Sequence, residues 1–69
     1  MSAEQMFEKL GYKKSECGVM YQKKDNPWEW IDFRTKGVTI STQNGLGYKY
    51  LSSEIIEAIY EQMKELGRL

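Results

Sequence analysis

The sequence predicts an α+β fold in two layers. An antiparallel sheet of three or four strands should carry a short N-terminal helix and a longer C-terminal helix on the same face. Three observations predict it: apolar residues recur with helical spacing at both ends of the chain, they alternate with polar residues through the middle, and Asn44-Gly45 is a strong hairpin-turn signal. Because each element has one apolar face, both helices can share one side of the sheet. With 69 residues, the chain is expected to form a single domain over residues 1–69.

The first element expected is a helix over residues 2–10. Ser2 is the N-cap candidate, and Gln5 three positions later completes a capping-box pattern. Gly11 falls where a glycine commonly ends a helix. The apolar positions share one face: Ala3, Met6, Phe7 and Leu10. A helix this short is not stable alone, so it should dock on the rest of the chain.

The middle of the chain has the pattern of strands separated by turns. Residues 12–18 are polar and lack a period, so we expect a loop in which only Tyr12 could belong to a strand. Three strands and a weaker fourth are expected over residues 19–23, 28–34, 38–42 and 46–50. Turn-forming residues separate them: Lys24-Asp25-Asn26-Pro27, Thr35-Lys36-Gly37 and Asn44-Gly45. Gly47 weakens the fourth strand.

The strand over residues 28–34 has the clearest two-sided pattern. Alternation places Ile31 and Phe33 on one face, and Trp28, Trp30 and Asp32 on the other. If Phe33 lies in the core, both tryptophan rings therefore point away from it.

The last element expected is a helix over residues 53–66, with Ser52 as its N-cap and Gly67 as its stop. Its apolar stripe consists of Ile55, Ile56, Ile59, Met63 and Leu66, and its acidic face of Glu54, Glu57, Glu61 and Glu65. Combining all elements predicts one shared core of Phe7, Leu10, Ile31, Phe33, Val38, Ile40, Ile59, Met63 and Leu66.

Composition argues against several functional classes. Ten basic and ten acidic residues give no net charge, which disfavours a duplex nucleic acid as partner. Without histidine and with Cys17 as the single cysteine, the chain has no His/Cys metal cluster and no Cys–His pair, so we expect neither an enzyme nor a metal or other cofactor. The lone cysteine and the absence of a signal peptide or an apolar span favour a cytoplasmic protein without a membrane segment.

Aromatic residues form the most interesting candidate site. Trp28 and Trp30 share a strand face, and Tyr48 and Tyr50 on the expected fourth strand could extend it. Such a face can be a hot spot for a protein partner, can mediate self-association, or can stack unpaired bases. The alternative is structural, with the rings covering the second face of a thin sheet and packing on Lys and Arg stems.

Parts of the chain resemble small uncharacterised proteins of phages and prophages in Gram-positive bacteria. The matching residues are Met6-Phe7-Glu8-Lys9-Leu10-Gly11-Tyr12, Ile31-Asp32-Phe33, Ala58-Ile59-Tyr60-Glu61-Gln62 and Glu65-Leu66-Gly67. Those proteins often carry an aromatic residue after the final glycine, where this chain has Arg68. The resemblance implies a phage or prophage accessory protein and carries no catalytic residue over.

The sequence therefore predicts a non-enzymatic phage or prophage accessory protein, in the cytoplasm of a bacterial host, that acts by binding a macromolecule and preferentially a protein. The alternative is a module that binds single-stranded nucleic acid through the same aromatic face.

Overall fold

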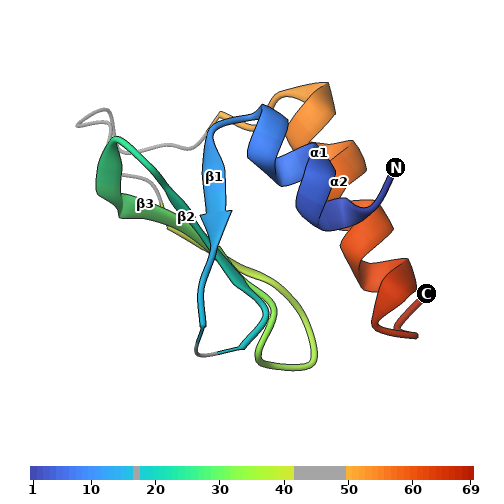
Figure 1. Ribbon diagram of the computed structural model, residues 1–69. Helices are drawn as coiled ribbons and strands as arrows, with labels where there is room; N and C mark the ends of the chain where they lie inside the picture. The colour runs from blue at the N-terminus through green and yellow to red at the C-terminus, as the bar shows by residue number, and fades with distance from the viewer. Residues whose placement is uncertain (17, 42–49) are drawn as a thin grey trace.

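The computed structural model describes residues 1–16, 18–41 and 50–69. It confirms the two-layer α+β fold: helices α1 and α2 pack side by side on one face of an antiparallel sheet in the order β1-β2-β3-β4 (Figure 1). The elements are α1 (Ala3–Lys9), β1 (Tyr12–Lys14), β2 (Met20–Lys23), β3 (Asn26–Asp32), β4 (Thr39–Ser41) and α2 (Ser53–Glu65).

Helix α1 begins with the capping box that the sequence predicts. The Ser2 hydroxyl accepts from the Gln5 N–H at 3.2 Å, and the Ser2 N–H donates to Gln5 Oε1 at 3.0 Å. The next free N–H of the first turn, that of Ala3, donates to Glu65 Oε2 at 2.8 Å. Because Glu65 is the last residue of α2, this bond holds the start of α1 against the end of α2. Gly11 ends the helix in the left-handed region, at φ 90°.

The prediction of a loop over residues 12–18 is wrong for its first three residues, because Tyr12–Lys14 forms β1 at the edge of the sheet. An edge strand buries little, and here Tyr12 is buried while Lys13 and Lys14 are exposed, so no run of apolar residues announced the strand. The expected strand over residues 46–50 lies outside the described residues except for Tyr50, which is not in a strand. The four strands of the described sheet are therefore the three that the sequence predicts together with the unexpected edge strand β1.

Strand β3 starts two residues earlier than expected, at Asn26, because Lys24 and Asp25 alone make the turn from β2. It ends at Asp32, although the Phe33 N–H still donates to the Val19 carbonyl at 2.9 Å. Strand β4 is shorter than expected, and Val38, expected in the core, precedes it and is 36% exposed. Beyond the end of the β3–β4 ladder, Val38 is not held against the helices.

The core consists of rings from the sheet packed against the two helices. Phe7, Ile31 and Phe33 are buried as expected. Five further expected positions pack against them in partly buried form: Leu10, Ile40, Ile59, Met63 and Leu66. Five buried residues were not in the expected set: Ala3, Tyr12, Tyr21, Ala58 and Gln62.

Tyr21 is the central member of this core. Its ring stacks on Phe7 of α1, with centroids 4.1 Å apart and planes at 23°. Its hydroxyl donates to Gln62 Oε1 of α2 at 2.5 Å in buried surroundings. One strand residue thus contacts both helices, and the bond explains why a glutamine can be buried on the inner side of α2.

Helix α2 starts at the predicted cap, where the Ser52 hydroxyl accepts from the Ile55 N–H at 3.2 Å. Ile56, expected in the apolar stripe, lies at its outer margin and is 54% exposed. Arg68 follows α2, and its Nη1 donates to the Phe33 carbonyl at 2.7 Å. This bond connects the segment after α2 to the β3–β4 connection. No helix in the described parts of the chain has the length and apolar character to cross a membrane.

Replacing Tyr21 with Phe should keep the ring stack and leave Gln62 Oε1 buried without its donor. We expect the free energy of unfolding to fall by about 1–3 kcal/mol, the typical cost of a buried group that loses its partner. Urea unfolding followed by circular dichroism measures it. Tyr60→Phe, an exposed hydroxyl on α2, is the matched control and should change stability by less than about 0.5 kcal/mol. Equal effects of the two variants would contradict this role of the Tyr21 hydroxyl.

Stability should also decline at alkaline pH. Burial, together with the charges of Glu4, Glu65 and Glu8, raises the pKa of Tyr21 to about 12, whereas an unfolded tyrosine has a pKa of about 10. The folded state binds this proton more tightly, so the stabilisation is complete below pH 10 and is lost as the pH rises from about 10 to 12. Urea midpoints measured from pH 8 to 11.5 should fall over this window, and less steeply in Tyr21→Phe. Identical slopes in the two proteins would exclude Tyr21 as a source.

Candidate functional site

The face of the sheet turned away from the helices is the candidate site, and we call it the outer sheet face. The register places Gln22, Trp30 and Ser41 side by side on neighbouring strands, and Met20, Asp32 and Thr39 in the next row. Lys13 on β1 lies opposite Gln22 and completes the face. Because both helices pack on the side of Tyr21 and Ile31, no described element covers this face (Figure 1).

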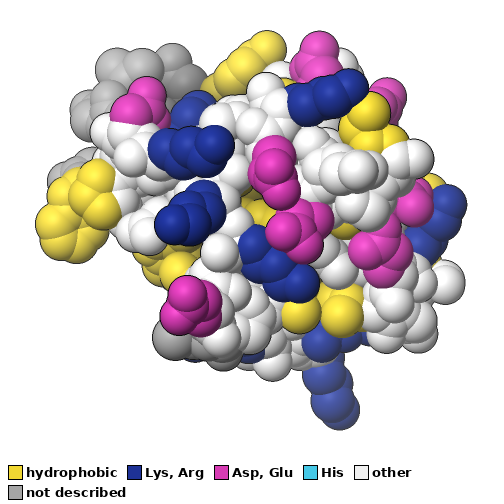
Figure 2. Space-filling view, in the orientation of Figure 1, with side chains coloured by type: hydrophobic (Ala, Val, Ile, Leu, Met, Phe, Trp, Pro, Cys, Tyr) yellow, Lys and Arg dark blue, Asp and Glu magenta, His cyan; other side chains and the backbone are white. Residues whose placement is uncertain are grey.

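Trp30 lies on the side expected from the sequence, opposite the buried Ile31, whereas Trp28 falls in a stretch of β3 that has no partner in the register. They differ in exposure: Trp30, between Gln22 and Ser41, is half-buried, whereas Trp28 is 65% exposed. Hydrophobic side chains stand out from the surface beside β3, at the left in Figure 2. The Trp30 ring is thus partly enclosed by its neighbours, and the Trp28 side chain is largely exposed to solvent.

A bulge in β3 explains the position of Trp28. Gln22 pairs with Trp30 while the next residue, Lys23, pairs with Asn26, so Pro27, Trp28 and Glu29 are extra residues on β3. A bulge of this kind interrupts the backbone ladder and redirects side chains.

Side chains replace the lost backbone pairing in the bulge. Gln22 Nε2 donates to the Pro27 carbonyl at 2.8 Å. The Trp28 N–H donates to Asn26 Oδ1 at 3.1 Å, and the Ser41 hydroxyl donates to the Trp28 carbonyl, also at 3.1 Å. Because these polar groups have partners, the backbone of the bulge has a defined conformation at Trp28.

Glu29 anchors the bulge from the inner side. Its Oε2 accepts from the Tyr12 hydroxyl at 2.9 Å and lies 3.6 Å from Lys23 Nζ. Lys23 Nζ in turn lies 5.3 Å from the centre of the Tyr12 ring. Tyr12 is only 3% exposed, and burial, followed by the hydrogen bond and charge of Glu29, raises its pKa above the usual range. The phenol therefore stays a proton donor to Glu29 at any physiological pH.

The charges of the outer sheet face largely neutralise each other. Arg34 Nε and Nη2 donate to the two Asp32 oxygens at 2.9–3.1 Å, and these bonds hold the pKa of the Asp32 carboxyl below its usual range. Lys13 remains as a cation on this face, at the β1 edge. The face offers aromatic and methionine surface with a few amide and hydroxyl groups, and it offers little charge.

The two tyrosines expected to extend this surface have different outcomes. Tyr50 is described, lies before α2 and is 79% exposed, but the structure shows no ring contact between it and either tryptophan. Tyr48 lies outside the described residues, as do Cys17 and the Asn44-Gly45 turn. The binding role of all four aromatic residues stays a prediction.

Sequence reasoning missed the residues that shape the site: Met20, Gln22, Asn26 and Ser41. One signal was available, because a proline within a strand pattern indicates an edge or a bulge. The turn-forming residues Lys24-Asp25-Asn26-Pro27 favour a turn at this proline instead.

The described residues contain no group of three Asp, Glu, His or Cys side chains placed to hold a metal ion. Tyr12, Tyr21, Asp32 and Glu54 have clearly shifted pKa values, and each of these four shifts follows from burial or from a structural hydrogen bond. The groups that the register places on the outer sheet face are an indole, a thioether, an amide and hydroxyls, beside the Asp32 carboxylate and Lys13.

Comparison with protein-family models, with curated proteins and with solved structures finds no significant match to this chain.

Replacing Glu29 with Ala should loosen the bulge, because Tyr12 loses its acceptor and Lys23 its counter-ion. We expect faster local motion of the Trp28 backbone amide and indole N–H, measured by ¹⁵N relaxation, with the rest of the sheet unchanged. Asp25→Ala removes the same charge from the adjacent turn and should leave Trp28 as in the wild type. Unchanged relaxation of Trp28 in Glu29→Ala would show that the anchor does not hold it.

Proposed function

We propose that this chain is a non-enzymatic binding protein whose outer sheet face receives a partner protein. The observation that carries the proposal is the bulge of β3, which holds an exposed Trp28 beside a half-buried Trp30. Its backbone groups are paired by Gln22, Asn26 and Ser41, so the surface exists before a partner arrives. A preformed surface loses little conformational entropy on binding.

A protein partner suits the chemistry of this face. Tryptophan and methionine are enriched at protein interfaces, and tryptophan is prominent among the residues that dominate binding energy. An aromatic patch that stays uncovered commonly marks an interaction site, and none of the described helices or strands covers this one. Gln22, Thr39 and Ser41 around Trp30 add hydrogen-bonding groups of the kind found at the rim of such interfaces.

The charge distribution favours protein over single-stranded nucleic acid. Proteins that stack bases combine aromatic rings with a positive groove that follows the phosphates. Here Asp32 neutralises Arg34, and Lys13 lies at the far edge from Trp28. Among the residues that the structure describes, the register places Lys13 as the one basic residue on this face, which fits an apolar interface better than a phosphate-binding groove.

The setting we propose is a phage or prophage protein in the cytoplasm of a bacterial host. The resemblance of the N-terminal segment, the Ile31-Asp32-Phe33 strand and the C-terminal helix to small phage proteins supports it. The absence of histidine and the single cysteine in the sequence support a non-enzymatic role in a reducing compartment.

The double variant Trp28→Ser/Trp30→Ser should stay folded and lose association. We expect helical circular dichroism close to wild type, because neither ring lies in the core, and loss of the proteins retained from a Gram-positive host lysate on immobilised chain. The matched control Ile56→Ser/Tyr60→Ser removes two exposed apolar side chains from α2 and should retain the same proteins. If the tryptophan variant unfolds, the rings are structural; if it stays folded and retains the same proteins, the site lies elsewhere.

Salt dependence distinguishes the two kinds of partner. Binding of a fluorescein-labelled oligothymidylate should be undetectable at 150 mM salt, whereas binding of the retained protein should change little between 50 and 300 mM salt. Tight oligonucleotide binding that falls steeply with salt and needs both tryptophans would favour the nucleic-acid alternative.

A further inference from the structure

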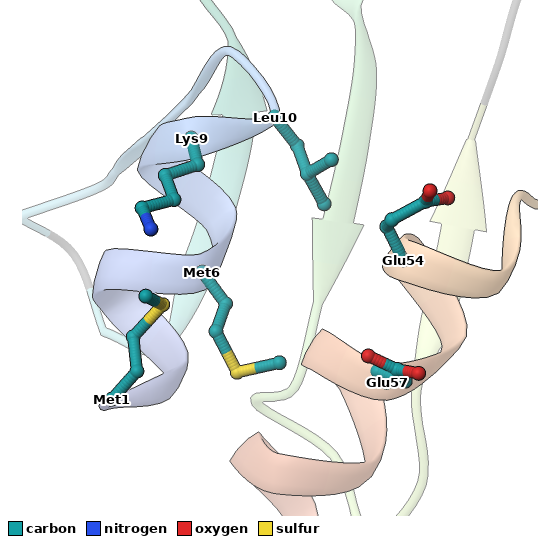
Figure 3. Close-up of a pocket in the computed structure, with 6 residues that line it drawn as sticks. All are labelled: Met1, Met6, Lys9, Leu10, Glu54 and Glu57. Carbon is teal, nitrogen blue, oxygen red and sulfur yellow. The ribbon is translucent and has the colours of Figure 1, made fainter.

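A small apolar groove lies on the opposite side of the molecule from the outer sheet face, between α1 and the start of α2. Its lining residues are Met1, Met6, Lys9, Leu10, Glu54 and Glu57, and its volume is about 160 Å³. Figure 3 shows the side chains of Met6 on α1 and of Leu10 at its end directed toward α2, with Glu54 and Glu57 on α2 across the space and the Glu54 carboxylate pointing away from Leu10. The floor is apolar and one rim is acidic.

The helices run antiparallel, which places the groove at one end of their contact. At the other end, the bond from the Ala3 N–H to Glu65 holds the helices together. The groove is thus built between two fixed elements, and Met6 and Leu10 form its floor while also packing against the core.

The size of the groove selects its occupant. A cavity of about 150 Å³ accepts a molecule the size of benzene, whereas sites for drug-sized ligands occupy about 300–1,000 Å³. One aliphatic or aromatic side chain therefore fits, and a cofactor does not. Methionine side chains adapt to different shapes and are common on surfaces that bind amphipathic helices.

The charges around the groove favour a partner that carries basic residues beside its apolar side chain. Helices α1 and α2 contain six glutamates and two lysines, and acidic side chains gather over them in Figure 2. Lys64 pairs with Glu61 at 3.3 Å, and Lys9 lies on the α1 rim. Glu54 and Glu57 are exposed on the α2 rim. Hydrogen bonds from its own backbone N–H and from Ser52 keep the pKa of Glu54 below its usual range, so it is anionic at neutral pH.

We propose that this groove is a second docking site, which takes one apolar side chain of a basic amphipathic helix from a partner protein. The apolar side chain contacts Met6 and Leu10, and Lys or Arg residues one turn away on the same helix pair with Glu54 and Glu57. This is the helix-in-groove mode of recognition. The proposal is independent of the outer sheet face, since it uses none of the same residues.

The test uses a synthetic 14-residue helical peptide of Leu and Lys, with the leucines on one face, and chain labelled with ¹³C at the methionine methyl groups. The four methionines report on different places: Met1 and Met6 line the groove, Met20 lies on β2, and Met63 packs against the core from α2. We expect the Met1 and Met6 signals to shift on titration while Met20 stays in place. A peptide with Ser in place of Leu should shift none of them.

Two double variants separate the groove from a general attraction of a basic peptide to an acidic layer. Glu54→Gln/Glu57→Gln should weaken binding about tenfold. Glu16→Gln/Asp25→Asn makes the same change in net charge at exposed positions of the sheet layer and should stay within twofold of the wild type. Equal weakening by both variants, a shift of Met20 in place of Met6, or no binding at millimolar peptide would each overturn the proposal.

Discussion

Tyr21 holds the sheet and the helix layer together through two contacts: its ring stacks on Phe7, and its hydroxyl donates to Gln62. Tyr21 lies on β2, inside the sheet, and contacts α1 through its ring and α2 through its hydroxyl. Tyr12 and Phe33 add edge-to-face contacts with Phe7. A 69-residue domain can bury little surface, so large rings that reach between elements supply much of the apolar area that a longer chain would obtain from many aliphatic residues.

This core determines which face of the sheet the two helices cover and which face they leave. Both helices are drawn to the side of Tyr21, and the strand alternation then places Trp30 on the other side. The helices themselves meet closely where Ala3 and Glu65 bond, and they leave a groove near Leu10 and Glu54. The same packing therefore produces both surfaces for which we propose partners, a weakly charged aromatic one and an acidic one with an apolar floor.

Periodicity and capping patterns predicted the fold class because they act within a few residues: the Ser2 and Ser52 caps and the alternation around Ile31 need no tertiary information. The sequence patterns did not predict features that depend on contacts between residues far apart in the chain. The buried hydroxyl of Tyr21 has its acceptor in Gln62, 41 positions away, and its ring packs on Phe7 of the first helix. The bulge around Trp28 depends on side chains from three strands, so alternation predicted the side of Trp30 and could not predict the bulge or the exposure of Trp28.

The most direct test of an open, preformed outer sheet face is quenching of tryptophan fluorescence by acrylamide in dilute single-tryptophan variants. In Trp30→Phe, the remaining Trp28 should emit like an indole in water and be quenched nearly as strongly as a free tryptophan derivative. In Trp28→Phe, the remaining Trp30 should be partly protected, in line with its half-buried place between Gln22 and Ser41. A blue-shifted, protected Trp28 in the monomer would mean that the chain covers this face itself, and the proposed binding surface would not exist.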